Sequence, residues 1–266
     1  MTTPPLSITV TGATGRLGRL LRHPWRGRGV AWHGRADGAL VPVLQARRCL
    51  VCLAGVVRGS RADLAANARI AVAALDAAAI AGVPRVLLFS SSAVYGRAHG
   101  PLGENRAITP ATEYGRAKLD MERAVADWSA ARPDGPQAVC LRLGNVAGAD
   151  ALLGRLGTDV PRLDIFDDGR GPRRNYIGPV TLAHVLERLA LDDMPLPPVL
   201  NLGTPGLVDM ADLLRAAGRD WIEVPAPDDA LPEVALDTTR LQRMIPLDPA
   251  TARPARLVAE WREAGT

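Results

Sequence analysis

Cysteine, histidine and long apolar runs are scarce in this chain of 266 residues, and each scarcity narrows the choice of function. Three cysteines, Cys49, Cys52 and Cys140, are too few for the disulfide framework of a small secreted domain. Cys49 and Cys52 have C-x-x-C spacing, but they lie in an apolar run without a second pair of ligands. The four histidines are isolated and lack metal-ligand spacing. We therefore expect no metal site and a reducing, cytoplasmic location.

No apolar run approaches the length of a membrane span, and the first residues lack the basic start and apolar core of a secretory signal. The net charge of +4 is mild, and the arginines are scattered without interleaved aromatic residues, which argues against a nucleic-acid surface. Hydrophobic residues make up 47% of the chain, enough for a sizeable core. The composition favours a globular protein whose partner is a small molecule, with no membrane or nucleic-acid partner.

Lysine is nearly absent, because 31 of the 32 basic residues are arginines and only Lys118 is a lysine. A lysine that survives this bias indicates a position where a planar, permanently charged guanidinium does not serve. Lys118 follows Tyr114 by four residues, so on a helix the two share a face. The ammonium would lower the pKa of the phenol and make it a general acid/base for a carbonyl/alcohol pair. The alternative is a surface lysine that happens to follow a tyrosine.

Apolar strand-like runs alternate with helix-like runs through the first half of the chain. The expected strands are 6–11, 30–33, 49–54, 86–89 and 138–143, and the expected helices are 17–22, 40–46, 62–81 and 112–131. This alternation predicts an α/β fold with a doubly wound parallel sheet. The pattern loosens after residue 149, where we expect helices at 181–191 and 209–217 and a strand at 199–202.

A glycine-rich turn with the spacing G-x-x-G-x-x-G follows the first strand and opens the first helix. Glycines at such a turn allow the backbone to approach a pyrophosphate, which the helix N-terminus attracts. The position between strand and helix indicates a dinucleotide site. The residues expected at it are Gly12, Thr14, Gly15, Arg16, Leu17 and Gly18. We therefore expect a Rossmann domain over residues 1–149 and a smaller substrate-binding region over 150–266, of which about 178–203 returns to the sheet.

The end of the second strand favours NADP over NAD. Where a dinucleotide fold often carries an acidic residue for the adenosine ribose, this chain has Gly34 followed by Arg35. An arginine there can pair with a 2′-phosphate, with help from Arg16. Asp37 is close enough in sequence to keep NAD open, and a solvated loop arginine is the alternative interpretation of Arg35.

A run of three serines, Ser90, Ser91 and Ser92, ends the fourth strand. Ligands bind at the C-terminal edge of such a sheet, so a serine hydroxyl there is placed to hydrogen-bond a substrate oxygen beside Tyr114. Serines at a strand end are otherwise common in turns. The presence of Tyr114 and Lys118 favours the functional interpretation.

Taken together, these motifs resemble the extended short-chain dehydrogenase/reductases of the NAD(P)-dependent epimerase/dehydratase family. The resemblance covers about residues 6–150 and continues weakly to 177 and through 201–203. The segments that carry it are 11–18, 53–55, Asn67, 90–96, Tyr114 with Lys118, and 141–148, which reads Leu-Arg-Leu-Gly-Asn-Val-Ala-Gly.

The resemblance implies a role for each matching position. Ser91, Tyr114 and Lys118 would be catalytic, and Tyr114 and Lys118 would also contact the cofactor. Asn67 would order the active site. Other residues expected along the cofactor are Leu53, Ala54, Gly55 and Ser90, and those expected at the substrate are Ser92, Asn145, Arg173 and Arg174. The helices at 62–81 and 112–131 correspond to those through which the family forms homodimers, so we expect a homodimer.

The chain departs from the family at two places. The dehydratases carry an Asp-Glu pair just after the catalytic Ser/Thr, where this chain has Ser92 and Ala93, so we disfavour dehydration. The C-terminal region is short, which predicts a reduced cap. We expect an oxidoreductase or epimerase acting on a hydroxyl or keto carbon of a sugar or sugar nucleotide. The alternatives are a reductase or dehydrogenase of a smaller carbonyl compound, such as an oxo-sugar or lactone, and a non-catalytic NAD(P) sensor.

Overall fold

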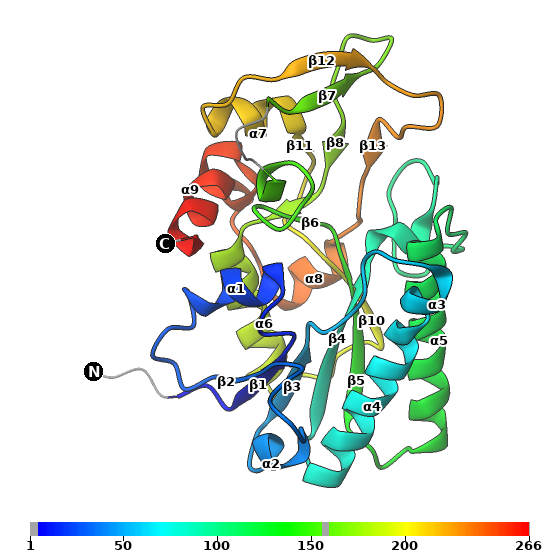
Figure 1. The fold of residues 1–266 in the computed structure, drawn as a ribbon, viewed down its shortest axis with the longest axis vertical. Helices are drawn as coiled ribbons and strands as arrows, with labels where there is room; N and C mark the ends of the chain where they lie inside the picture. Colours follow the sequence, from blue (N-terminus) through cyan, green and yellow to red (C-terminus); the bar gives the residue numbers. More distant parts are fainter. Residues whose placement is uncertain (1–4, 156–159, 266) are drawn as a thin grey trace.

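A computed structural model describes residues 5–155 and 160–265. Within this part of the chain a parallel sheet has the strand order β10-β5-β4-β3-β1-β2 (Figure 1). Its strands are β1 (Ile8–Thr11), β2 (Ala31–His33), β3 (Cys49–Cys52), β4 (Arg85–Ser91), β5 (Gln137–Leu143) and β10 (Val199–Leu202). The predicted α/β fold with a doubly wound parallel sheet is therefore confirmed.

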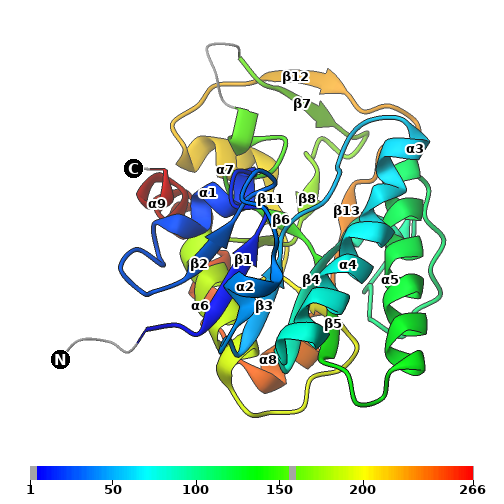
Figure 2. The ribbon, with the colours of Figure 1, turned by 60° about the horizontal axis from the view of Figure 1, so that its bottom comes forward.

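Helices cover both faces of this sheet (Figure 2). On one face lie α1 (Arg16–Arg22) and α6 (Pro179–Leu191), and on the other lie α2 (Val41–Leu44), α4 (Ala66–Ala81) and α5 (Glu113–Ala131). Successive strand residues point to opposite faces, so Val51 and Leu87 pack under α6 while Leu50 and Leu88 pack under α4 and α5. Burial on both faces explains why the strands read as continuous apolar runs.

Smaller elements stand above the C-terminal edge of the sheet (Figure 1). Three short sheets pair β12 with β7, β6 with β9, and β8 with both β11 and β13. The strands are β6 (Asn145–Val146), β7 (Arg162–Ile165), β8 (Arg173–Arg174), β9 (Tyr176–Ile177), β11 (Val208–Asp209), β12 (Ile222–Pro225) and β13 (Glu233–Val234). Besides α6, the helices after residue 149 in the described residues are η2 (Leu153–Arg155), α7 (Met210–Ala216), α8 (Thr239–Met244), η3 (Pro249–Ala252) and α9 (Pro254–Ala264).

The segment predicted as one helix over 62–81 is divided. A short helix α3 (Arg61–Leu64) ends at Ala65, and α4 continues from Ala66. By length and composition alone the segment 61–81 is apolar enough to cross a membrane, whereas the sequence analysis expected no such run. The core helix of a globular protein meets the same criteria, and Ala71, Ala74 and Ala78 of α4 belong to the core cluster that α4 shares with the sheet and α5. The feature is therefore weak support for a membrane span.

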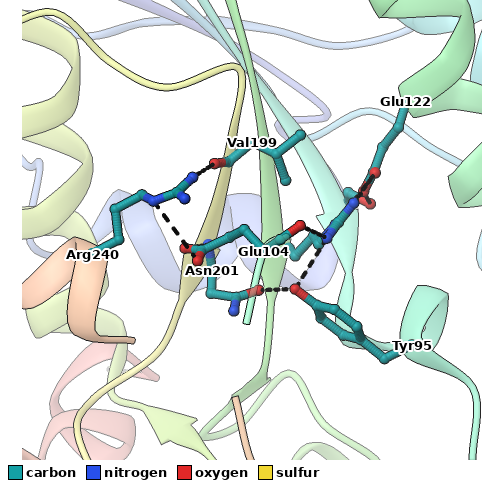
Figure 3. A network of polar contacts seen from close by, with 8 residues as sticks. Tyr95, Glu104, Glu122, Val199, Asn201 and Arg240 are labelled. Carbon is teal, nitrogen blue, oxygen red and sulfur yellow. Dashed lines mark hydrogen bonds and ion pairs between the residues drawn. The ribbon is translucent and has the colours of Figure 1, made fainter. Parts of the chain in front are cut away.

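A buried ion pair joins β5 to α5. The Arg142 guanidinium lies 2.7 Å from the Glu122 carboxylate, and the two side chains are 4% and 6% exposed. Glu122 also accepts a 2.5 Å hydrogen bond from the Ser90 hydroxyl at the end of β4. Arg142 donates further to the Tyr95 hydroxyl and the Glu104 carbonyl (Figure 3). Tyr95 belongs to a short helix, η1 (Ser92–Tyr95), that follows β4.

The same network holds the returning strand β10. The Tyr95 hydroxyl donates to the Asn201 side chain at 2.7 Å, and the Glu104 carboxylate accepts from the Asn201 backbone N–H (Figure 3). The Asn201 amide in turn donates to the carbonyls of Leu102 and Asp237. A network of buried, hydrogen-bonded polar groups thus connects strands β4, β5 and β10 with the loop after η1 and the segment before α8.

Replacing only one member of the buried pair leaves the other charge unpaired in the core. We expect Arg142→Met to lower the free energy of unfolding by about 3–5 kcal/mol in urea denaturation. The matched control is Arg97→Met, because Arg97 makes an exposed pair with Asp229 and should lose less than about 1 kcal/mol. Adding Glu122→Leu to Arg142→Met should recover part of the loss. Equal losses in the buried and exposed variants would contradict this view of the pair.

Candidate active site

The glycine turn presses against the end of β3. Gly12 has a φ of 78°, and a Cβ built on it would lie 2.7 Å from the Ala54 backbone nitrogen. A Cβ on Gly18 would lie 2.5 Å from the Gly12 carbonyl oxygen. Side chains at these two positions are therefore excluded by backbone atoms, and the turn adopts the close approach that the sequence spacing predicts.

A cleft in two parts runs across the C-terminal edge of the sheet on both sides of this turn. Both parts contain Gly12, Gly15, Leu53 and Gly55. One part, of about 650 Å³, extends over the ends of β2 and β3 and along α4; its other lining residues include Thr11, Thr14, His33, Gly34, Arg35, Leu40, Cys52, Ala54, Ile70, Ala73 and Ala77. The other, of about 510 Å³, reaches Arg16, Leu17, Gly18, Tyr114, Asn145 and Asp150. The arrangement suits an elongated ligand lying across the turn.

Tyr114 lines the second part of the cleft, at the start of α5. A hydrogen bond with the Ser91 side chain joins it to the end of β4. The Thr112 hydroxyl caps α5 by accepting from the Gly115 N–H, which fixes the first turn that carries Tyr114. Ser91 in turn accepts from the Ala93 N–H and begins η1. The structure thus brings Ser91 against Tyr114; Tyr114 lines the cleft, whereas Ser91 is not among the lining residues in the described part of the chain.

Lys118 lies beneath Tyr114 and is almost fully buried. Its Nζ is 5.9 Å from the centre of the Tyr114 ring and donates to the Phe89 carbonyl at 2.8 Å. Burial lowers the pKa of Lys118 to about 8. Burial also raises the pKa of Tyr114, and only the Ser91 hydrogen bond works in the opposite direction. The net shift of the Tyr114 pKa is therefore opposite in direction to the one expected from Lys118, whose catalytic role stays a prediction.

Asn67 orders the loop that separates the two parts of the cleft. Its side-chain amide donates to the carbonyls of Val56 and Leu64, and its oxygen accepts from the Val56 N–H. A Cβ on Gly55 would lie 2.8 Å from this oxygen and 3.3 Å from the Lys118 Nζ. A side chain at position 55 would therefore displace the Asn67 oxygen and crowd the Lys118 Nζ.

Several of the predicted site residues have partners within the protein. The Ser90 hydroxyl donates to Glu122 and is absent from the cleft lining in the described residues. The Arg16 guanidinium donates to the carbonyls of Ala149 and Asp150, which reduces the help it can give to a 2′-phosphate.

The two arginines expected at the substrate also have partners. Arg173 pairs with Glu233 at 3.1 Å. Arg174 donates to the backbone carbonyls of Arg173, Leu231 and Pro232, and burial lowers its pKa. Asn145 lies on the cleft, and its side chain is hydrogen-bonded to Tyr176. Of the residues expected at the substrate, Asn145 is therefore the one that lines this cleft among the described residues, with Ser92 placed at the start of η1.

Asp150 is a carboxylate in the cleft that the motifs of the sequence did not indicate. It accepts from the Tyr176 hydroxyl at 2.8 Å and from the Leu153 and Gly154 N–H groups, and burial raises its pKa. No local pattern marks a single aspartate in a loop, and its place in the cleft depends on Tyr176, which is 26 residues away. In the described residues, no group of three or more His, Cys, Asp and Glu side chains is placed to hold a metal ion.

The burial of Lys118 predicts an effect on stability. Its folded-state pKa of about 8 lies below the ordinary 10.5, so between these pH values the unfolded chain binds more protons and the free energy of unfolding rises with pH. We expect the free energy of unfolding of Lys118→Met at pH 7 to be about 1–3 kcal/mol higher than that of the wild type, after allowance for the lost hydrogen bond to the Phe89 carbonyl. The difference should shrink by pH 10.5 in urea titrations. If the difference in free energy of unfolding does not change with pH, Lys118 is not a buried lysine with a lowered pKa.

The chain is similar to known proteins both in sequence and in fold. Residues 50–162 match the model of the NAD dependent epimerase/dehydratase family. A search among curated proteins gave no match. Among solved structures, the chain is similar to the UDP-glucose-4-epimerase of Stenotrophomonas maltophila with bound NAD and formylated UDP-arabinopyranose, with a TM-score of 0.77 and 21% identity over 98% of each chain.

Two further structures have the same fold. The UDP-N-acetylglucosamine 4-epimerase of Methanobrevibacter ruminantium M1 has a TM-score of 0.77 and 17% identity, over 99% of this chain and 100% of that one. The NAD dependent NDP-hexosamine 5,6-dehydratase TunA of tunicamycin biosynthesis has a TM-score of 0.76 and 22% identity over 97% of each chain. The resemblance to the epimerase/dehydratase family that the motifs predicted is thereby confirmed over residues 50–162. Nearly the whole chain shares the fold of the three solved structures.

Proposed function

We propose that this chain is an NAD(P)-dependent oxidoreductase or epimerase that acts by hydride transfer at a hydroxyl- or keto-bearing carbon of a sugar or sugar nucleotide. The observation that carries the proposal is the contact of Tyr114 with Ser91 and its position over Lys118, where Tyr114 lines a cleft that continues past the glycine turn. The family match over 50–162 and the nucleotide sugars named with the similar structures support it.

The residues fit a nicotinamide dinucleotide. Its pyrophosphate would lie at Gly12, Gly15 and the start of α1, where backbone approach is closest. When bound, the dinucleotide supplies the hydride acceptor or donor. We propose NADP over NAD, because Arg35 lines the cleft at the end of β2.

Tyr114 performs the proton transfer in this proposal. In the reducing direction the Tyr114 hydroxyl gives its proton to the carbonyl oxygen and becomes a phenolate, and in the oxidising direction the phenolate form takes the proton of the substrate hydroxyl. The Ser91 hydroxyl orients that oxygen through its contact with the phenol. Lys118 positions the start of α5 through its bond to the Phe89 carbonyl. The complete set of three residues favours an enzyme over a non-catalytic sensor.

Dehydration is the less favoured reaction, although a dehydratase occurs among the similar structures and the fold alone does not exclude it. The proposal against it rests on Ser92 and Ala93, which stand where the dehydratases carry two carboxylates. The carboxylate that does line the cleft, Asp150, is already bonded to Tyr176 and two backbone N–H groups.

A second candidate is a reductase or dehydrogenase of a smaller carbonyl compound. Arg173 is paired with Glu233, and Arg174 donates to backbone carbonyls. Both arginines are therefore less able to bind a diphosphate, which favours a smaller substrate. The chain nevertheless spans 97–100% of the similar enzymes named above, which favours the nucleotide sugar. The reduced cap, the cytoplasmic location and a homodimer through α4 and α5 stay predictions.

Removing the phenol hydroxyl tests the mechanism. Tyr114→Phe should lose at least about 100-fold in turnover, because general acid/base catalysis contributes on this scale, and should keep dinucleotide affinity within a few-fold. The matched control is Tyr95→Phe, which removes a hydroxyl from the buried network and should lower the melting temperature while retaining turnover within about tenfold. Turnover is measured by nicotinamide absorbance or by analysis of the sugar product. Unchanged turnover in Tyr114→Phe would falsify the acid/base role.

The amount of dinucleotide that the purified protein retains distinguishes an epimerase from a reductase or dehydrogenase. An epimerase regenerates its dinucleotide in each turnover and can retain it, so denatured protein should release close to one equivalent, identified by enzymatic assay or mass spectrometry. A reductase or dehydrogenase exchanges its cofactor and should be purified largely empty. We expect released NADP(H); released NAD(H) would contradict the preference based on Arg35.

A further inference from the structure

The Arg16 side chain bridges the two walls of the part of the cleft that Tyr114 lines. One wall is the glycine turn with the start of α1, and the other is the loop over 147–152 that follows β6. From the first wall, the Arg16 guanidinium donates to the carbonyls of Ala149 at 3.0 Å and Asp150 at 3.2 Å. All three residues line the cleft, so the bridge lies at the cleft itself.

A second hollow lies on the other side of this bridge. Arg16 lines it together with Arg19, Gly148 and Gly154. The guanidinium therefore stands between the cleft and the neighbouring hollow. Breaking its two hydrogen bonds would open the cleft toward that hollow.

The loop end of the bridge is anchored. The Asp150 carboxylate accepts from the Tyr176 hydroxyl at 2.8 Å and from the N–H groups of Leu153 and Gly154. Tyr176 is fully buried, so the loop is fixed to the C-terminal half of the chain. Arg16 therefore ties the glycine turn to a support that does not depend on Arg16 itself.

The arginine end of the bridge is reversible. Arg16 is exposed, and both of its hydrogen bonds run from the same nitrogen, Nη1, to neutral backbone carbonyls. Exposed side chains change rotamer rapidly, and water replaces a carbonyl as acceptor at a modest net cost. The bridge can therefore break and re-form without disturbing either wall of the cleft.

We propose that Arg16 is a latch that slows the release of a dinucleotide from the cleft by tying the glycine turn to the loop over 147–152. The proposal rests on the proposed function, because it requires the chain to bind a dinucleotide across this turn. Release then requires the two hydrogen bonds to break, which for a charged donor slows release by about tenfold. Arg16 acts through the loop, so it is a positioning residue and not a catalytic one.

The test compares Arg16→Ala with Arg19→Ala. Arg19 is the matched control, because it lies one turn further along α1, donates to the Thr14 carbonyl, and lines the neighbouring hollow but not the cleft. The full chain is loaded with NADPH or NADH, whichever binds more tightly, and chased with an excess of the oxidised form while nicotinamide fluorescence is followed. Arg16→Ala should release the dinucleotide about tenfold faster than the wild type, and Arg19→Ala should stay within about twofold of it.

Hydrogen exchange of the backbone amides shows whether Arg16 acts through the loop. In Arg16→Ala the segment 147–154 should exchange faster than in the wild type, because the loop loses its tie to the turn. Melting temperatures of both alanine variants should stay close to that of the wild type, since both side chains are exposed. Arg16→Lys keeps a cationic donor and should release the dinucleotide at an intermediate rate, and it carries the test if Arg16→Ala does not fold.

The outcomes separate this inference from the proposed function. Unchanged release in Arg16→Ala, or equal acceleration in Arg19→Ala, would overturn the latch while leaving dinucleotide binding intact. Faster release without faster exchange in 147–154 would also overturn it, because Arg16 would then act on the dinucleotide directly. A wild type that binds neither NADPH nor NADH would overturn both the latch and the proposed function.

Discussion

The pairing of Arg142 with Glu122 is the contact on which the rest of the site depends. Two charges removed from water are tolerated only with good geometry and further hydrogen bonds, and here Ser90 and Tyr95 supply them. Glu122 follows Lys118 by one helical turn, and Ser90 precedes Ser91 in the chain. The pair that joins β5 to α5 therefore also sets the distance between the strand end and the helix that carry the candidate catalytic residues.

Close backbone approach is the second constraint, and it explains the glycines and Asn67. A Cβ on Gly12 would collide with the backbone at the end of β3, and a Cβ on Gly55 would crowd the Asn67 side-chain oxygen and the Lys118 Nζ. Asn67 fixes this loop by bonding both the N–H and the carbonyl of Val56. The same crowding removes water from Lys118 and lowers its pKa, so the arrangement that suits the proposed chemistry opposes stability.

Local patterns predicted the parts of this protein that depend on local physics. The apolar runs gave the strands, and the cap at Thr112 and the i, i+4 spacing gave the start of α5 and the shared position of Tyr114 and Lys118. Local patterns did not indicate the hydrogen bonds that depend on a distant residue. Ser90 is drawn to Glu122, Arg16 to the carbonyl of Asp150, and Lys118 to that of Phe89. The helix predicted over 62–81 divides because Ser60 and Asp63 cap a separate first turn.

The sequence by itself determined the fold class, the glycine turn, and the identity of the residues that end each strand, because strand period, helix period and turn chemistry are encoded within a few positions. The tertiary structure alone decided which polar groups find a hydrogen-bond partner within the protein and which do not. Asp150 is held by Tyr176, and His33 is left with an unpartnered Nε2 opposite Thr11. Hydrogen bonds and desolvation are properties of neighbours in space, and those neighbours come from strands and loops far apart in the chain.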